Sequence, residues 1–148
     1  MSKIIFTRPE DGGVSIVTPT SGTATEALAS KTVPAGVDYE IVNDNVIPTS
    51  RRFRDAWQKS GTTVVVDITK AKVIALAQLR EAAVRTLEKC RLKDDLGEAK
   101  AYTLAQVQAA YQTAMTNLNT KVNAADLESC VDDFINTYEL EQPQQGGY

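Results

Sequence analysis

The side chains best suited to chemistry in this sequence lie close together, where Arg51, Arg52 and Arg54 surround Phe53 and precede Trp57, the only tryptophan. Guanidinium groups bind carboxylates and phosphates, often with two parallel hydrogen bonds. Phe53 and Trp57 are four residues apart, so in a short helical turn they share one face. This segment is therefore the first candidate for an interface or a hinge.

Three hypotheses fit the segment. In the first, the arginines pair with acids such as Asp55 or Asp44 while the aromatic side chains pack inward and pin the turn to a sheet. In the second, arginine and tryptophan anchor a contact with another protein. In the third, the segment binds phosphate or nucleic acid. A sequence pI of about 5.0 and the lack of a wider basic surface argue against the third.

Catalytic chemistry has few candidate residues. The sequence contains no histidine, which removes the commonest general base and the commonest nitrogen ligand for metals. Cys90 and Cys130 occur without a CxxC motif, and both follow helical apolar patterns typical of buried, reduced thiols. The acid pairs 94–95 and 132–133 are adjacent in sequence, so they point to different faces of a helix. We expect no catalytic residue, no metal and no cofactor.

Composition indicates a folded chain with uneven charge. The 148 residues are 43% hydrophobic and 24% charged, which suits one domain or two small units. Residues 1–100 hold 15 basic and 13 acidic residues (+2), whereas residues 101–148 hold one lysine and six acids (−5). This asymmetry suggests head-to-tail charge complementarity between copies or with a partner. No apolar run is long enough for a signal peptide or a membrane span, so we expect a protein made in a cytosol, without nucleic-acid or membrane partners.

The first 66 residues predict short strands and turns. Segments 3–7 and 14–18 are β-rich, and Asp11-Gly12-Gly13 between them favours a hairpin. The capping-box pattern from Thr23 to Glu26 predicts a short helix over 24–30. Residues 38–42 and 62–66 predict two further strands, residues 51–57 predict a short helical turn, and Ser60-Gly61 predicts a break.

The second half predicts helices. The first begins near Ile68, is capped by Asp67 and is broken by the charged run 91–100. Thr103 and Asn123 predict the caps of two more. The expected apolar stripes contain Val73, Leu76, Ala83, Leu87 and Cys90 in the first helix, Leu104, Val107, Tyr111, Ala114 and Leu118 in the second, and Leu127, Val131, Phe134 and Tyr138 in the third. The regular second stripe, with Tyr111 at its centre, also suits self-association, so Tyr111 is a further interface candidate.

Together these patterns predict an α+β fold. A small, mostly antiparallel sheet with a short helix over residues 1–66 is followed by an array of about three helices over 67–140. Residues 141–148 predict a flexible polar tail.

Two segments resemble small tail-region virion proteins of tailed bacteriophages. The shared pattern is a strand preceded by proline and glycine, a P-[ST]-[DS]-R-x-F-R-x-A-W segment, and V-D-[IM]-x-K-A at a helix start. The matching residues are Pro34, Gly36, Tyr39, Val42, Pro48, Arg51, Phe53, Arg54, Ala56, Trp57, Val66, Asp67, Lys70 and Ala71. The resemblance covers roughly residues 1–75. Ser50 stands where these proteins often carry aspartate.

The resemblance implies a non-enzymatic structural protein of a virion, made in the host bacterial cytoplasm and placed in the tail, baseplate or tail-fibre region. Its partners would be other phage structural proteins, including a tail fibre, and further copies of itself. The helical half is similar in pattern to tail-fibre assembly proteins, which act as chaperones and leave the mature particle. A protein that binds a host factor and an enzyme with a carboxylate-only site are further alternatives.

Overall fold

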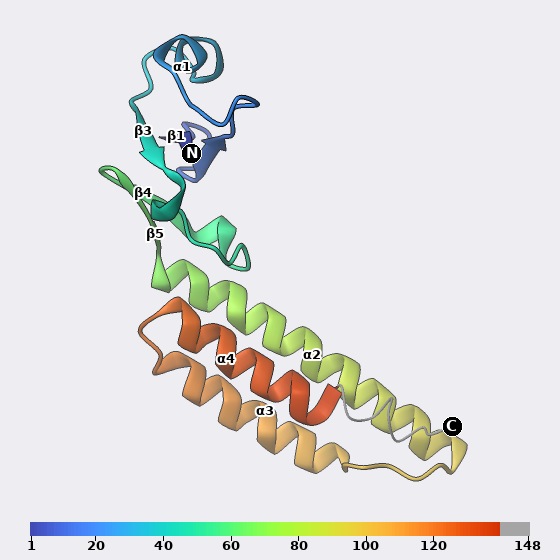
Figure 1. Ribbon diagram of the computed structural model, residues 1–148. Coiled ribbons are helices and arrows are strands. Elements are labelled where there is room, and N and C mark those ends of the chain that lie inside the picture. Colours follow the sequence, from blue (N-terminus) through green and yellow to red (C-terminus); the bar gives the residue numbers. More distant parts are fainter. Residues whose placement is uncertain (140–148) are drawn as a thin grey trace. The chain divides into compact units, whose positions relative to one another are not determined.

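The computed structural model describes residues 1–139 and divides the chain into two compact units, Met1–Asp67 and Ile68–Tyr148 (Figure 1). The first holds the β-strands and a short helix, and the second holds the long helices. The predicted α+β class is therefore confirmed. The boundary lies one residue from the expected one, and the expected tail at 141–148 lies outside the described residues.

A three-stranded antiparallel sheet forms the first unit, with β1 (Ser2–Thr7) between β2 (Val14–Val17) and β3 (Tyr39–Asn43). In register, Ile4 is paired with Val17 on one side and Ile41 on the other. The predicted hairpin of the first two strands is confirmed. The third strand begins and ends one residue later than expected.

Neighbouring residues of β1 build two separate cores, because successive side chains point to opposite faces of a strand. Ile4 packs with Ala24 and with Ala29 of α1 (Glu26–Thr32). Ile5 faces the other way and packs with Trp57, in a cluster completed by Val14, Val42 and Val64. Both isoleucine side chains are fully buried. The central strand thus fixes both halves of this unit.

Trp57 reaches its core from a second, two-stranded sheet. This sheet pairs β4 (Trp57–Ser60) with β5 (Thr63–Val66), and Gly61, at φ +59°, makes the tight turn between them. The expected strand at 62–66 is present, but its partner β4 was missed. The expected helical turn over 51–57 was wrong in extent, because only η2 (Arg54–Ala56) is helical and Trp57 pairs with Val66 instead.

The short helix α1 begins two residues later than its capping pattern predicts. Thr25, not Thr23, is the N-cap, and its hydroxyl accepts a hydrogen bond from the Leu28 amide at 3.2 Å. The Ala24 amide instead donates to Ser2 Oγ at 2.7 Å. This bond ties the segment before the helix to β1. One further short segment, η1 (Asp44–Val46), follows β3.

Three helices pack against one another in the second unit: α2 (Ile68–Leu96), α3 (Leu104–Asn119) and α4 (Ala124–Phe134). A π-helical turn, η3 (Ile135–Glu139), continues the last. The predicted caps of α3 and α4 are confirmed. Thr103 forms a capping box with Gln106, and Asn123 Oδ1 accepts from the Asp126 amide at 2.9 Å.

The packed face of α2 differs from the expected one. Val73 is 67% exposed, and Leu76 and Leu87 are only half-buried, whereas Ala83 and Cys90 are buried as expected. The residues that pack inward are mostly small: Ala71, Ala75, Leu79, Ala82, Ala83, Thr86 and Cys90. Small side chains let three helices approach closely, so the larger apolar residues do not mark the core here. The expected break within 91–100 is confirmed, since α2 ends at Leu96 and Gly97 follows at φ +73°.

Candidate functional site

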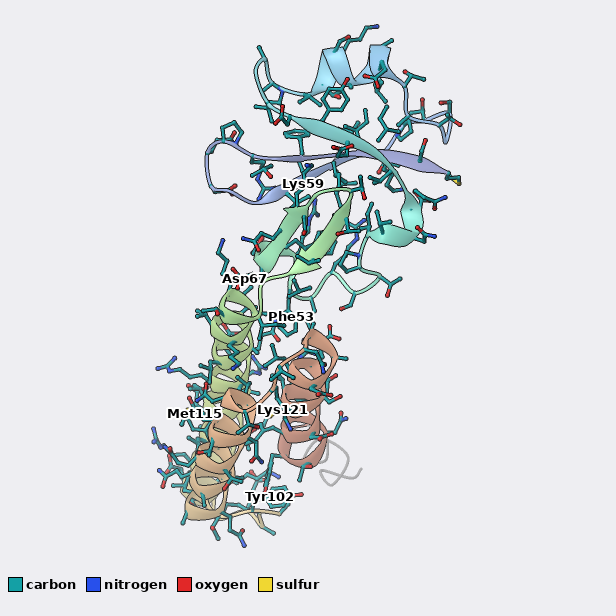
Figure 2. All side chains as sticks on the ribbon, turned by 90° about the vertical axis from the view of Figure 1, so that its left-hand side faces the viewer. Phe53, Lys59, Asp67, Tyr102, Met115 and Lys121 are labelled. Atoms are coloured by element: carbon teal, nitrogen blue, oxygen red, sulfur yellow. The ribbon has the colours of Figure 1, made fainter. Side chains whose placement is uncertain are left out.

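The arginine segment of the first unit combines exposed charges with buried rings. Arg51 and Arg54 are exposed and Arg52 is half-buried, while Phe53 and Trp57 are 2% and 1% exposed. The backbone turns tightly here, with the Arg54 amide bonded to Arg51 O and the Ala56 amide to Phe53 O. Figure 2 shows Phe53 in the segment before β4. The arginines are thus presented at the surface by aromatic side chains buried beneath them.

Trp57 contributes to the core of its unit, with its ring in the cluster around Ile5. Its indole Nε1 is buried and has no hydrogen-bond partner among the described residues. A donor left in this state opposes folding by about 1–3 kcal/mol, so the ring is retained through its apolar contacts. A hinge role for this segment remains a prediction.

Tyr111, the sixth candidate, belongs to α3 of the second unit and is half-buried. Its neighbours in the expected stripe divide into two groups. Val107 and Leu118 are fully buried, whereas Ala114 lies in the lining of an open groove. Some residues of this stripe therefore pack inside the helical unit, and others line a surface groove.

The groove lies between α3 and α4 and has a volume of about 490 Å³. Ala110 and Ala114 from α3, with Cys130 and Phe134 from α4, give it an apolar lining. Figure 2 shows Tyr102 and Lys121 beside the two ends of α3, and Lys121 is also part of the groove lining. The short alanine side chains leave this space open.

Charge in the groove comes from α4 and the loop before it. Asp126 and Asp133 contribute carboxylates, and Lys121 contributes one ammonium group. Burial raises the pKa of the Cys130 thiol above its ordinary value, and Asp133 adds to the rise while Lys121 opposes it. The thiol donates a weak hydrogen bond to Ala114 O at 3.5 Å. Cys130 is therefore a protonated, poorly nucleophilic group at neutral pH.

A second surface feature is a stripe on the outside of α2. Val73, Ala77, Arg80 and Val84 are all exposed and are spaced 4-3-4, so they line one face of the helix. Val73 lies two residues after the buried Ala71, and two residues turn about 200° around a helix. The stripe therefore points away from α3 and α4. We call these four residues, with Arg91 seven positions further on, the outer stripe.

Sequence reasoning missed both the groove and the outer stripe. Val73 was assigned to the core, and Ala114 was treated as one more position of an apolar stripe. One signal was present in the sequence, because α3 contains no charged residue over its 16 positions. A surface helix without charge is unusual and is typical of helices that contact a partner.

The hairpin loop of the first unit holds a well-formed ion pair. Arg8 binds both carboxylate oxygens of Asp11, at 3.0 and 3.1 Å, and its third nitrogen donates to Val14 O at 2.9 Å. Asp11 also accepts from the Gly13 amide at 2.9 Å. The Arg8 hydrogen bonds, followed by that of Gly13, lower the pKa of Asp11. This network explains the loop conformation without a ligand.

Metal-binding clusters and membrane-spanning helices are both absent from the described part of the chain. Residues 1–139 contain no group of three or more histidine, cysteine or acidic side chains arranged to hold a metal ion. None of the helices described there combines the length and apolar character needed to cross a bilayer.

Comparison with known proteins gave no match. No protein-family model fits the sequence, and no curated protein and no solved structure is significantly similar to the chain.

Proposed function

We propose that this chain is a non-enzymatic structural component of a bacteriophage virion, in the tail, baseplate or tail-fibre region, which acts through protein–protein interfaces. The observation that carries the interface role is the set of exposed apolar side chains on α2. Val73, Leu92 and Leu96 are 67%, 60% and 71% exposed. Leu92 and Leu96 are four residues apart and share one face of the helix, and neighbouring exposed apolar side chains favour a contact with another protein.

Further support comes from the open edges of the sheet. β2 and β3 are the outer strands of the order β2-β1-β3, so each has one side without a partner strand in the described residues. Such edges offer backbone donors and acceptors that a neighbouring protein's strand extends. The virion setting itself rests on the resemblance of residues 34–71 to phage tail-region proteins.

Mass spectrometry of purified particles of the encoding phage tests the proposal. A structural component is expected in a constant, stoichiometric amount relative to the other virion proteins. The matched control is a non-virion protein from the same infected cells, carried through the same purification. Absence of the chain from particles would overturn the virion role.

A tail-fibre assembly chaperone is the second candidate. It is favoured by the same exposed side chains of α2, because a chaperone holds the apolar surface of an unfolded partner. This alternative predicts that the chain raises the soluble yield of the fibre protein on co-expression and is missing from particles. A structural component is expected in the particles whether or not it affects that yield.

A further inference from the structure

We infer that the helical unit binds a second copy of itself head to tail, with the outer stripe of α2 in one copy seated in the α3–α4 groove of the next. This inference goes beyond the proposed function, since it concerns the isolated chain and holds in or out of a virion. It rests on shape, charge and the positions of the two surfaces.

Shape is the first argument. The groove is open along Ala110 to Asn117 of α3, and its other wall runs from Asp126 of α4 to Tyr138 of η3. Those spans are about 10 and 18 Å at the rise of a helix. The outer stripe from Val73 to Val84 spans about 16 Å by the same measure. Three of the four side chains from Val73 to Val84 are short and apolar, and a helix face of that kind fits between two neighbouring helices as a fourth member of the bundle.

Opposite charges on the two surfaces favour α2 of a second copy as the occupant of the groove. α2 carries seven basic and four acidic residues, α4 carries four acidic and no basic ones, and α3 carries none. Arg80 and Arg91 of the outer stripe would thus meet Asp126 and Asp133 of the groove. Each surface also has a charge of the other sign: Glu88 borders the mostly basic stripe, and Lys121 lines the mostly acidic groove. Neither Arg80 nor Arg91 forms an ion pair within the described residues.

Position decides the kind of assembly. α2 packs on both α3 and α4 and contributes nothing to the groove lining. The groove and the outer stripe therefore lie on opposite sides of the helical unit. A contact between two different surfaces leaves one of each unused in a dimer, so it continues into a ring or a chain. Association should not stop at two copies.

The experiment uses the full chain and two complementary variants. The stripe variant carries Val73→Glu and Arg80→Glu, and the groove variant carries Ser129→Arg and Asp133→Arg. All four positions are exposed, so the fold should be retained, and circular dichroism checks this. The double variant Val65→Glu with Lys31→Glu is the matched control, because it makes the same charge change at one apolar and one basic position, both exposed, in the first unit.

Sedimentation velocity at rising concentration gives the readout. The wild type and the control variant should form species larger than a dimer, and the stripe variant or the groove variant alone should associate about 30-fold or more weakly. An equal mixture of the two variants should form a dimer and nothing larger, because it retains one intact stripe and one intact groove. The intact groove in this dimer belongs to the stripe variant. Cys130 of the stripe variant, followed separately by its mass, should therefore react more slowly with a maleimide in the mixture than when that variant is alone.

Three results would overturn the inference. The first is a wild type that stays monomeric, which includes the case of a groove filled by residues 140–148 of its own copy. The second is self-association that survives both double variants. The third is a mixture that forms no dimer while both variants remain folded.

Discussion

The two units bury their apolar surface in different ways. In the first, large side chains from distant strands meet, and Ile5, Val42 and Trp57 close one face of the sheet. In the second, α2 packs inward mostly through small residues such as Ala71, Ala75 and Ala82, while Val73 and Leu92 remain exposed. The difference shows that a closely packed core does not require every large apolar side chain to be buried. The helical unit packs closely and still presents apolar side chains to a partner.

Trp57→Ala should break the first unit and is the largest expected effect. Loss of this fully packed ring should lower the free energy of unfolding of that unit by about 3–5 kcal/mol. Amide hydrogen exchange of β1, read by mass spectrometry, measures the loss. Trp57→Phe is the control and should cost far less, because the indole Nε1 has no partner among the described residues. Unchanged exchange in Trp57→Ala, together with lost assembly, would make the ring an interface anchor instead.

Ala82→Leu should test close packing in the second unit. Ala82 is fully buried, so the larger side chain should separate the helices and lower the free energy of unfolding by about 1–3 kcal/mol. Thermal unfolding followed by far-ultraviolet circular dichroism reports the change. Ala109→Leu, at an exposed position of α3, should leave the melting temperature nearly unchanged. Equal effects of the two substitutions would contradict close packing of α2 through its small residues.

Asn123→Ala should weaken the start of α4 by about 1 kcal/mol, since it removes the side-chain oxygen that caps the helix. The effect is smaller because no core contact changes. Asn123→Ser keeps a capping oxygen without placing a second carboxylate beside Asp126, and should retain most of the wild-type melting temperature. Thermal unfolding should show a lower melting temperature for the alanine variant than for the variant that keeps a capping oxygen. Equal melting temperatures of the two would contradict the capping role.

Asp11→Asn should give the smallest effect, confined to the hairpin loop of the first unit. The lowered pKa of Asp11 means that its pairing with Arg8 stabilises the fold above the ordinary value of 3.8. That contribution is lost as pH falls through the lower folded value. The difference between wild type and Asp11→Asn should therefore be present at neutral pH and vanish in acid. Glu10→Gln, which removes a charge from the same loop, should show no such pH dependence.

Local chemistry made several elements predictable from the sequence. Asp11-Gly12-Gly13 selected the hairpin, and Thr103 and Asn123 selected two helix starts, because each acts through hydrogen bonds to residues nearby in the chain. The fold class followed from the order of these elements. Those bonds depend little on the rest of the molecule.

Elements that depend on distant contacts were missed or shifted. β4 forms because Trp57 pairs with Val66 across the turn at Gly61, which the aromatic spacing alone did not reveal. The N-cap of α1 is Thr25 instead of Thr23, and the Ala24 amide between them is bound by Ser2, more than twenty positions away. The groove is defined by Ala110 and Ala114, small residues whose importance comes from the space they leave.

Trp57 also gives the molecule a built-in optical reporter. It is the only tryptophan in the sequence, and it lies in the core of the first unit. Its fluorescence therefore follows that unit alone, whereas the helical signal in circular dichroism comes mainly from the second, which holds the long helices. Denaturation curves recorded by the two signals on one unlabelled sample would coincide if the units unfold as a single cooperative block and diverge if they unfold separately.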